Sequence, residues 1–205
     1  MEGDVFSGLD VPRGTLDLFR AYANEIIRWN DSVKLVSKKD SLSENSLMHR
    51  HIFDSLQIID FIMNDDVVLD IGSGAGFPGF VIAALTSSYV TLIEPNYKKA
   101  AFLRYISEKF SVRCDIQQIR AEEYRNLHKE IDVITSRAFA SMLSVVEGSI
   151  HNISENTRII LFKSDLQLEI ELKELASFYD FNLQVFTSKI NTESKIVLLS
   201  KIKLK

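Results

Sequence analysis

Short apolar runs alternate with amphipathic segments along most of the chain. From Val67 onward we expect strands at residues 67–71, 89–94, 112–118, 131–135, 157–162, 181–187 and 195–200. Helices should lie between them, near residues 78–86, 97–109, 120–128, 139–150 and 166–178. Only residues 188–194 separate the last two strands, so these strands should form an antiparallel hairpin. The alternation predicts an α/β fold: a Rossmann-like, doubly wound sheet of seven mostly parallel strands with an antiparallel last strand.

The first 65 residues show a helical period instead. Residues 15–30 carry regularly spaced apolar side chains. Ser41 and Glu44 form a capping-box pattern before a second helix, and residues 64–66 should end it. We therefore predict a helical cap over residues 1–65 and an α/β core over residues 66–205. The apolar face of the second helix is Leu47, Ile52, Leu56, Ile59 and Ile62.

The turn after the first strand contains the most informative pattern. Asp70 ends that strand, and Phe77-Pro78-Gly79 begins the helix beyond the turn. Glycines there permit positive φ angles and let a ligand contact the backbone. Glu94 ends the next strand, where an acid binds ribose hydroxyls in nucleoside-binding folds. The pattern predicts an adenosine-containing cofactor, although both acids also fit a purely loop-capping role. The glycines are Gly72, Gly74 and Gly76.

The spacing G-x-G-x-G differs from the G-x-G-x-x-G of dinucleotide dehydrogenases. Together with the terminal hairpin it favours S-adenosylmethionine and a methyltransferase; a dinucleotide enzyme or an unused glycine turn is the alternative. The segment 132–140 has no proline, so it lacks the Pro-Pro patch common in amine methylation. Cys114, the only cysteine, falls on a predicted strand and does not suit nucleophilic attack on a pyrimidine. A target such as guanine N7, which needs no general base, fits by elimination, and other targets stay open.

Composition narrows the class of protein further. The 205 residues suit one domain, and a single cysteine, which allows no intrachain disulfide, suits a reducing cytoplasm. No stretch approaches the roughly 18 apolar residues of a membrane span. The net charge of −4 argues against general polyanion binding but leaves room for local basic faces. We expect a cytoplasmic monomer without membrane contact, and no pattern indicates a metal site.

Longer motifs extend over nearly the whole chain. They include Arg-His-Ile-Phe-Asp-Ser at residues 50–55 and Ser-Arg-Ala-Phe-Ala at residues 136–140. With the glycine turn, Lys98-Lys99 and Arg120-Ala121-Glu122-Glu123, these motifs resemble the bacterial small-subunit rRNA guanine-N7 methyltransferases, the glucose-inhibited division protein B family. That family methylates N7 of guanine 527 in the 530 loop of 16S rRNA. Lys34 and Ser164 depart from its usual Asn and Gly, which concerns the RNA contacts more than the reaction.

The resemblance implies a set of site residues. Arg137 is the candidate catalytic residue; a salt bridge to a neighbouring acid is its structural alternative. Asp54 either caps a helix turn or pairs with Arg50. Two other functions compete with rRNA methylation: methylation of a small molecule or protein, and a noncatalytic nucleotide-binding module. By the resemblance, the cofactor contacts are Gly72, Phe77, Ala121, Glu122 and Arg137. The residues themselves add Gly74, Gly76 and Glu94 to the cofactor contacts and indicate RNA contacts on the small ribosomal subunit at Lys38, Arg50, His51, Lys98 and Arg104.

Overall fold

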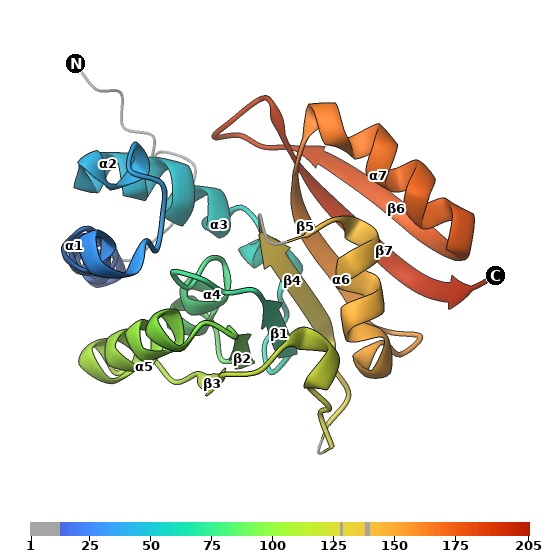
Figure 1. The fold of residues 1–205 in the computed structure, drawn as a ribbon, viewed down its shortest axis with the longest axis horizontal. Helices are drawn as coiled ribbons and strands as arrows, with labels where there is room; N and C mark the ends of the chain where they lie inside the picture. The colour runs from blue at the N-terminus through green and yellow to red at the C-terminus, as the bar shows by residue number, and fades with distance from the viewer. Residues whose placement is uncertain (1–12, 128, 138–139) are drawn as a thin grey trace.

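The protein is built around one seven-stranded sheet. The computed structural model describes residues 13–127, 129–137 and 140–205. The strand order is β3-β2-β1-β4-β5-β7-β6, and β7 runs antiparallel to the other six strands (Figure 1). The predicted sheet and its terminal hairpin are therefore confirmed. The strands are β1 (Val67–Ile71), β2 (Tyr89–Ile93), β3 (Asp115–Gln117), β4 (Val133–Arg137), β5 (Arg158–Ser164), β6 (Tyr179–Thr187) and β7 (Ser194–Leu204).

Helices cover both faces of the sheet. The first face packs against α1 (Arg13–Val33), α4 (Gly79–Leu85) and α5 (Tyr97–Phe110), and the second packs against α6 (Met142–Ser149) and α7 (Asp165–Phe178) (Figure 1). Every residue of β1 is buried, as expected for a central strand between two helical layers. Phe19 and Tyr22 of the predicted cap share one apolar cluster with Val68 and Leu92 of the sheet, so the first core crosses the proposed cap–core boundary.

The second cap helix differs from the prediction. It is divided into α2 (Glu44–Leu47), a π-helical turn η2 (Met48–Phe53), α3 (Asp54–Leu56) and a 3₁₀ turn η3 (Ile59–Phe61), after a 3₁₀ turn η1 (Asp40–Leu42). The capping box at Ser41 is wrong: Ser43 caps α2 by accepting a hydrogen bond from the amide of Ser46. Glu44 instead pairs with Arg20 of α1 at 2.6 Å, because the two helices pack together.

Three further differences lie between the strands. The helix predicted at 120–128 is wrong: a 3₁₀ turn, η4 (Ala121–Glu123), is followed by residues 124–127 without regular secondary structure, and residue 128 lies outside the described residues. The third strand is shorter than predicted, so Cys114 lies just before it, half-buried. α6 (Met142–Ser149) begins three residues after the start of the helix predicted at 139–150, and residue 139 itself lies outside the described residues. A 3₁₀ turn, η5 (Ile150–Asn152), ends it.

Candidate functional site

The glycine turn lies at the carboxyl ends of β1 and β2. The amides of Gly72 and Ser73 both donate to the carbonyl of Ile93, at 2.9 and 3.0 Å. Gly72 and Gly74 have φ angles of 72° and 57° and are partly exposed. A residue with a side chain would be strained at these positive φ angles, and its Cβ would partly cover the backbone that a ligand could contact. These two glycines therefore present bare backbone at the edge of the sheet where α/β folds bind ligands.

Two carboxylates hold this turn in place. Asp70 is fully buried; it accepts hydrogen bonds from the Gly79 amide at 3.3 Å and the Thr135 hydroxyl at 2.9 Å. Burial raises the pKa of Asp70 to about 6, and its structural role is to brace the turn from below. Glu94 accepts from the amides of Gly74 at 2.9 Å and Asn96 at 2.8 Å. Each carboxylate oxygen has a second lone pair, so Glu94 braces the turn and still has acceptor sites for ribose hydroxyls.

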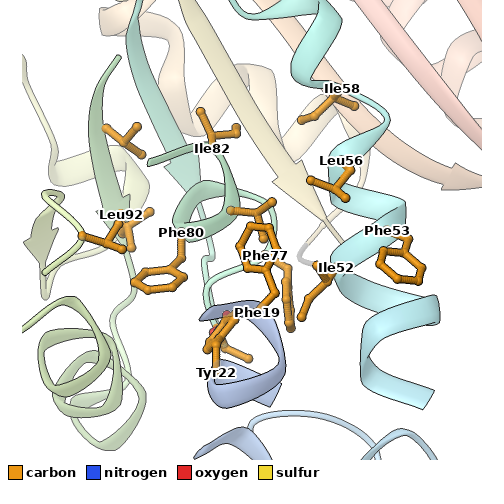
Figure 2. Packing of buried hydrophobic residues seen from close by; sticks show 14 of the residues in the cluster. Phe19, Tyr22, Ile52, Phe53, Leu56, Ile58, Phe77, Phe80, Ile82 and Leu92 are labelled. Carbon is orange, nitrogen blue, oxygen red and sulfur yellow. The ribbon is translucent and has the colours of Figure 1, made fainter. Parts of the chain in front are cut away.

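Gly76 and Phe77 join the turn to the cap. Gly76 is buried with a φ angle of 104°, and a Cβ on it would lie 2.7 Å from the Tyr22 hydroxyl. That hydroxyl donates to the carbonyl of Ala75. The Phe77 ring lies against Tyr22 at 5.5 Å between centroids and stacks on His51 at 5.0 Å. Figure 2 shows it between α1 and the η2–α3 segment that carries Ile52 and Leu56. The structure thus gives both residues a packing role, and their contact with a cofactor stays a prediction.

The residues after β3 complete this edge of the sheet. The Gln117 carbonyl accepts from the Glu94 amide at 3.1 Å, so the chain leaving β3 starts beside the turn. In η4, Ala121 is buried and Glu122 is exposed. This edge fits an adenosyl group with a charged amino-acid tail. Gly72 and Gly74 offer backbone without Cβ atoms, Glu94 offers a carboxylate at the ribose position, and Ala121 adds a small side chain.

Arg137 ends β4 and reaches across to the cap. Its guanidinium donates to the carbonyls of Arg50 at 2.5 Å and His51 at 3.4 Å, and lies 3.3 Å from the Asp54 carboxylate. The pairing of Asp54 with Arg50 is wrong, because Arg50 pairs with Asp40 at 2.6 Å. The guanidinium is mostly buried, and this desolvation lowers the pKa of Arg137, although Arg remains charged at any physiological pH.

A hydrogen-bond network behind Asp54 was missed by the sequence analysis. Its carboxylate accepts from the Gln57 amide at 2.9 Å and the Ser188 hydroxyl at 3.2 Å. The Lys189 amide donates to the Gln57 side-chain oxygen at 2.6 Å, which ties the β6–β7 loop to the cap. No local sequence signal predicts contacts between residues more than 130 positions apart.

His51 is a neutral group in this structure. Burial, followed by the charge of Arg137, lowers the pKa of His51 to about 4, although its Nε2 lies 3.3 Å from an Asp40 oxygen. At pH 7 it therefore brings no positive charge to an RNA phosphate. The other expected RNA contacts, Lys38, Arg50, Lys98 and Arg104, are exposed, and they stay predictions.

A hollow of about 630 Å³ opens beside Arg137, between the cap, the carboxyl ends of β4 and β5, and the β6–β7 loop. It lies next to the glycine turn, because the Ser136 hydroxyl at the end of β4 bonds the Ile71 carbonyl at the end of β1. Its described lining residues are Asp40, His49, Arg50, His51, Asp54, Arg137, Phe162, Lys163, Ser164, Ile190, Asn191, Glu193 and Ser194.

Solved structures with this fold include methyltransferases of several kinds. A ribosomal protein L11 methylase from Lactobacillus delbrueckii subsp. bulgaricus superposes with a TM-score of 0.59 over 72% of this chain and 76% of its own, at 14% identity. A TehB-like S-adenosylmethionine-dependent methyltransferase from Corynebacterium glutamicum gives 0.59 over 88% and 98%, at 11% identity. These likenesses show that the chain has the Rossmann-like fold found in S-adenosylmethionine-dependent methyltransferases.

Sequence relatives specify the family. The family model described as rRNA small subunit methyltransferase G matches residues 15–197. The Ribosomal RNA small subunit methyltransferase G of Rickettsia felis is 34% identical over 197 residues, 95% of this chain and 97% of that protein. The protein of the same name from Gluconobacter oxydans is 31% identical over 94% of this chain and 97% of its own. The chain belongs to the rRNA small subunit methyltransferase G family.

Proposed function

We propose that this enzyme transfers the methyl group of S-adenosylmethionine to N7 of guanine 527 in the 530 loop of 16S rRNA. The observation that carries this proposal is the hollow beside Arg137, at the end of the strand next to the glycine turn. Two of the three carboxylates in its lining, Asp40 and Asp54, are already ion-paired, and no cysteine lies among its described lining residues. Guanine N7 has a free lone pair, so it needs alignment rather than proton removal or a covalent nucleophile.

The cofactor would lie along the edge formed by the ends of β1, β2 and β3. Bound there, S-adenosylmethionine supplies an electrophilic methyl group. The backbone at Gly72 and Gly74 would take its amino-acid part and Glu94 its ribose, with Ala121 and Glu122 beside the base. We propose Gly76 and Phe77 as part of the same site, acting from beneath through their packing on Tyr22.

Arg137 would act as the catalytic residue by holding the guanine or its phosphate against the cofactor. A guanidinium has five N–H donors, and the two carbonyls and the Asp54 carboxylate use only some of them. The remaining donors are available to a substrate in the hollow. Because the cap fixes the guanidinium before substrate arrives, little rotamer entropy is lost on binding.

The RNA would approach over the exposed basic residues of the cap and α5, Lys38, Arg50, Lys98 and Arg104, while His51 would position the cap through its stacking on Phe77. We also propose that the enzyme is a cytoplasmic monomer in which residues 1–65 form the cap. Among the described residues, no helix is long and apolar enough to span a bilayer. Light scattering of the purified chain tests the monomer.

The experiment that tests the reaction follows labelled methyl groups from S-adenosylmethionine into small ribosomal subunits and into free 16S rRNA. Digestion of the product should yield N7-methylguanosine from the 530 loop. Another methylated nucleoside, or the same nucleoside from another position, would contradict the proposed specificity. Turnover with no RNA at all, but with a small molecule or protein, would instead support the alternative target class.

A further inference from the structure

The charges that line the hollow are balanced, with one exception. The three cationic side chains are each paired: Arg50 with Asp40 at 2.6 Å, Arg137 with Asp54 at 3.3 Å, and Lys163 with Glu171 at 2.8 Å. The remaining carboxylate in the lining is Glu193, for which no side-chain ion pair or hydrogen bond is formed with any described residue. The hollow therefore exposes one uncompensated negative charge.

The backbone around Glu193 is fixed in place. The Glu193 carbonyl accepts from the Asp165 amide at 2.9 Å, and its amide donates to the Asn191 side chain at 3.2 Å. The Ser188 hydroxyl accepts from the amides of Ile190 and Asn191, both at 3.1 Å, and Ser188 itself bonds Asp54. The β6–β7 loop thus holds Glu193 against the same network that holds Arg137.

A free carboxylate is costly at a site for RNA, because it repels phosphates. It is favourable only where the substrate presents hydrogen-bond donors to it. Guanine presents two adjacent donors on its Watson–Crick edge, N1–H and N2–H₂, in a fork that matches a carboxylate. Adenine presents an acceptor at N1 instead, which a carboxylate repels.

The hollow places Glu193 on a wall apart from the cofactor edge. The cofactor edge is at β1 and β2, and the hollow extends from β4 across β5 to the start of β7. In guanine, N7 and the Watson–Crick edge flank O6, so N7 and the N1–H and N2–H₂ donors face roughly perpendicular directions. A guanine whose N7 faces the cofactor edge therefore directs N1 and N2 to a different wall of the hollow, and the β6–β7 loop that carries Glu193 forms one such wall. Figure 1 shows the β6–β7 loop at this end of the sheet, near α3.

We infer that Glu193 reads the target base: its carboxylate accepts hydrogen bonds from N1–H and N2–H₂ of a guanine held in the hollow. This inference rests on the proposed methylation at guanine N7. Glu193 is then a specificity-determining residue, because losing a charged hydrogen-bond acceptor to the base weakens recognition of guanine by roughly tenfold to a hundredfold.

The test compares 16S rRNA that carries guanosine or inosine at the target position, assembled into small subunits. Inosine keeps N7 and N1–H but lacks the N2 amino group. The wild-type enzyme should prefer guanosine by roughly tenfold or more in kcat/KM. Glu193→Ala should lower kcat/KM on guanosine and bring the guanosine-to-inosine ratio close to one, and Glu193→Gln should give an intermediate ratio.

Glu174→Ala, an exposed carboxylate on α7 outside the hollow, is the matched control and should keep the wild-type ratio. Thermal melts and S-adenosylmethionine affinity verify that each variant is folded. An unchanged ratio in Glu193→Ala, or an equal loss on both RNAs, would overturn the inference while N7 methylation stands. If the wild-type enzyme forms no N7-methylated purine on either RNA, the proposed function itself fails.

Discussion

Arg137 has a structural role in this protein, and the proposed function gives it a second role toward the substrate. It joins β4 to the cap through Asp54 and two cap carbonyls. Arg158 makes a similar arrangement at the opposite end of the sheet, with the Phe61 carbonyl at 2.6 Å and Asp66 at 2.7 Å. Both arginines join the cap to the sheet, but only Arg137 lines the hollow. The salt bridge alone therefore does not distinguish a catalytic arginine from a structural one.

Arg137→Lys should separate the two roles. Lysine keeps the charge beside Asp54 but loses the planar fork that reaches several acceptors at once. We expect a loss of about 1.5–3 kcal/mol of transition-state stabilisation, which lowers kcat/KM tenfold or more. The melting temperature should change only slightly. Arg158→Lys is the control, and it should change stability without changing kcat/KM of the folded enzyme. Wild-type turnover in Arg137→Lys would show that Arg137 is purely structural.

His51 should make the protein less stable in mild acid. Its pKa is about 4 in the folded state and about 6.5 when unfolded, so between these values the unfolded chain binds the extra proton. The free energy of unfolding therefore falls as the pH drops from 7 toward 4, and His51 should account for about 2 kcal/mol of loss at pH 5. His51→Gln should show a correspondingly smaller difference between urea titrations at pH 7 and pH 5.

Asp70 changes the free energy of unfolding with pH in the direction opposite to His51. Its folded pKa of about 6 lies above the unfolded value, so the folded chain binds the extra proton and the contribution of Asp70 improves as the pH falls through 6. The comparison of His51→Gln with wild type is informative because Asp70 is present in both proteins and its contribution cancels. Equal losses of stability in the two proteins would contradict a buried neutral histidine.

Among the elements, the π-helical turn η2 and the glycine turn decide the shape of the site. The widened turn at residues 48–53 interrupts a segment that the apolar period predicted as one continuous helix. The carbonyls of Arg50 and His51 in this turn accept the Arg137 hydrogen bonds. Such π-turns are frequent at functional sites, and here the turn supplies acceptors to a side chain from another element.

The glycine turn should tolerate no side chain at Gly72. We expect Gly72→Val to weaken S-adenosylmethionine binding at least tenfold in calorimetry, because the positive φ and the bare backbone are both lost.

Gly74→Ala should cost about 1–2 kcal/mol of stability from its φ of 57°, although space for a methyl group is present. Gly14→Ala on α1 is the control, since nothing lies within 4 Å of its Cβ position. Unchanged cofactor affinity in Gly72→Val would remove this turn from the site.

At the scale of the whole molecule, an acidic protein must bind a polyanion. The net charge is −4, so any attraction to RNA has to come from local clusters rather than from the total charge. Lys98 and Arg104 are exposed on α5, beside the cap and on the first face of the sheet. Lys203 and Lys205 lie at the end of β7, which runs away from the hollow toward the opposite end of the sheet.

Charge reversal should show which of the two basic clusters, on α5 or at the end of β7, contacts the RNA. The double variant Lys98→Glu/Arg104→Glu should bind rRNA more weakly and reduce the salt slope of log K by about 0.7 for each phosphate that is no longer neutralised, with S-adenosylmethionine affinity unchanged. The control, Lys203→Glu/Lys205→Glu, should keep the wild-type slope. Filter binding across a salt series measures both. If neither double variant changes the slope, the RNA is held by shape and stacking instead.

The sequence by itself determined the sheet, the cofactor S-adenosylmethionine and the family. These features depend on local patterns: apolar runs of strand length, glycines at alternate positions in one turn, and a carboxylate at the end of the next strand. The errors were local too, where tertiary contacts outweighed the pattern. Glu44 pairs with α1 instead of closing a capping box, and residues 124–127 have no regular secondary structure where a helix was predicted.

Only the tertiary structure decided how the substrate side is built. The pairing of Arg137 with Asp54, the links from Asp54 to Ser188, and the neutral state of His51 all join residues far apart in the chain. Hydrogen bonds and desolvation depend on distance in space, and sequence spacing contains that information only within a single helix, turn or strand pair. For the same reason, the free carboxylate of Glu193 in the hollow became visible only once its neighbours were in place.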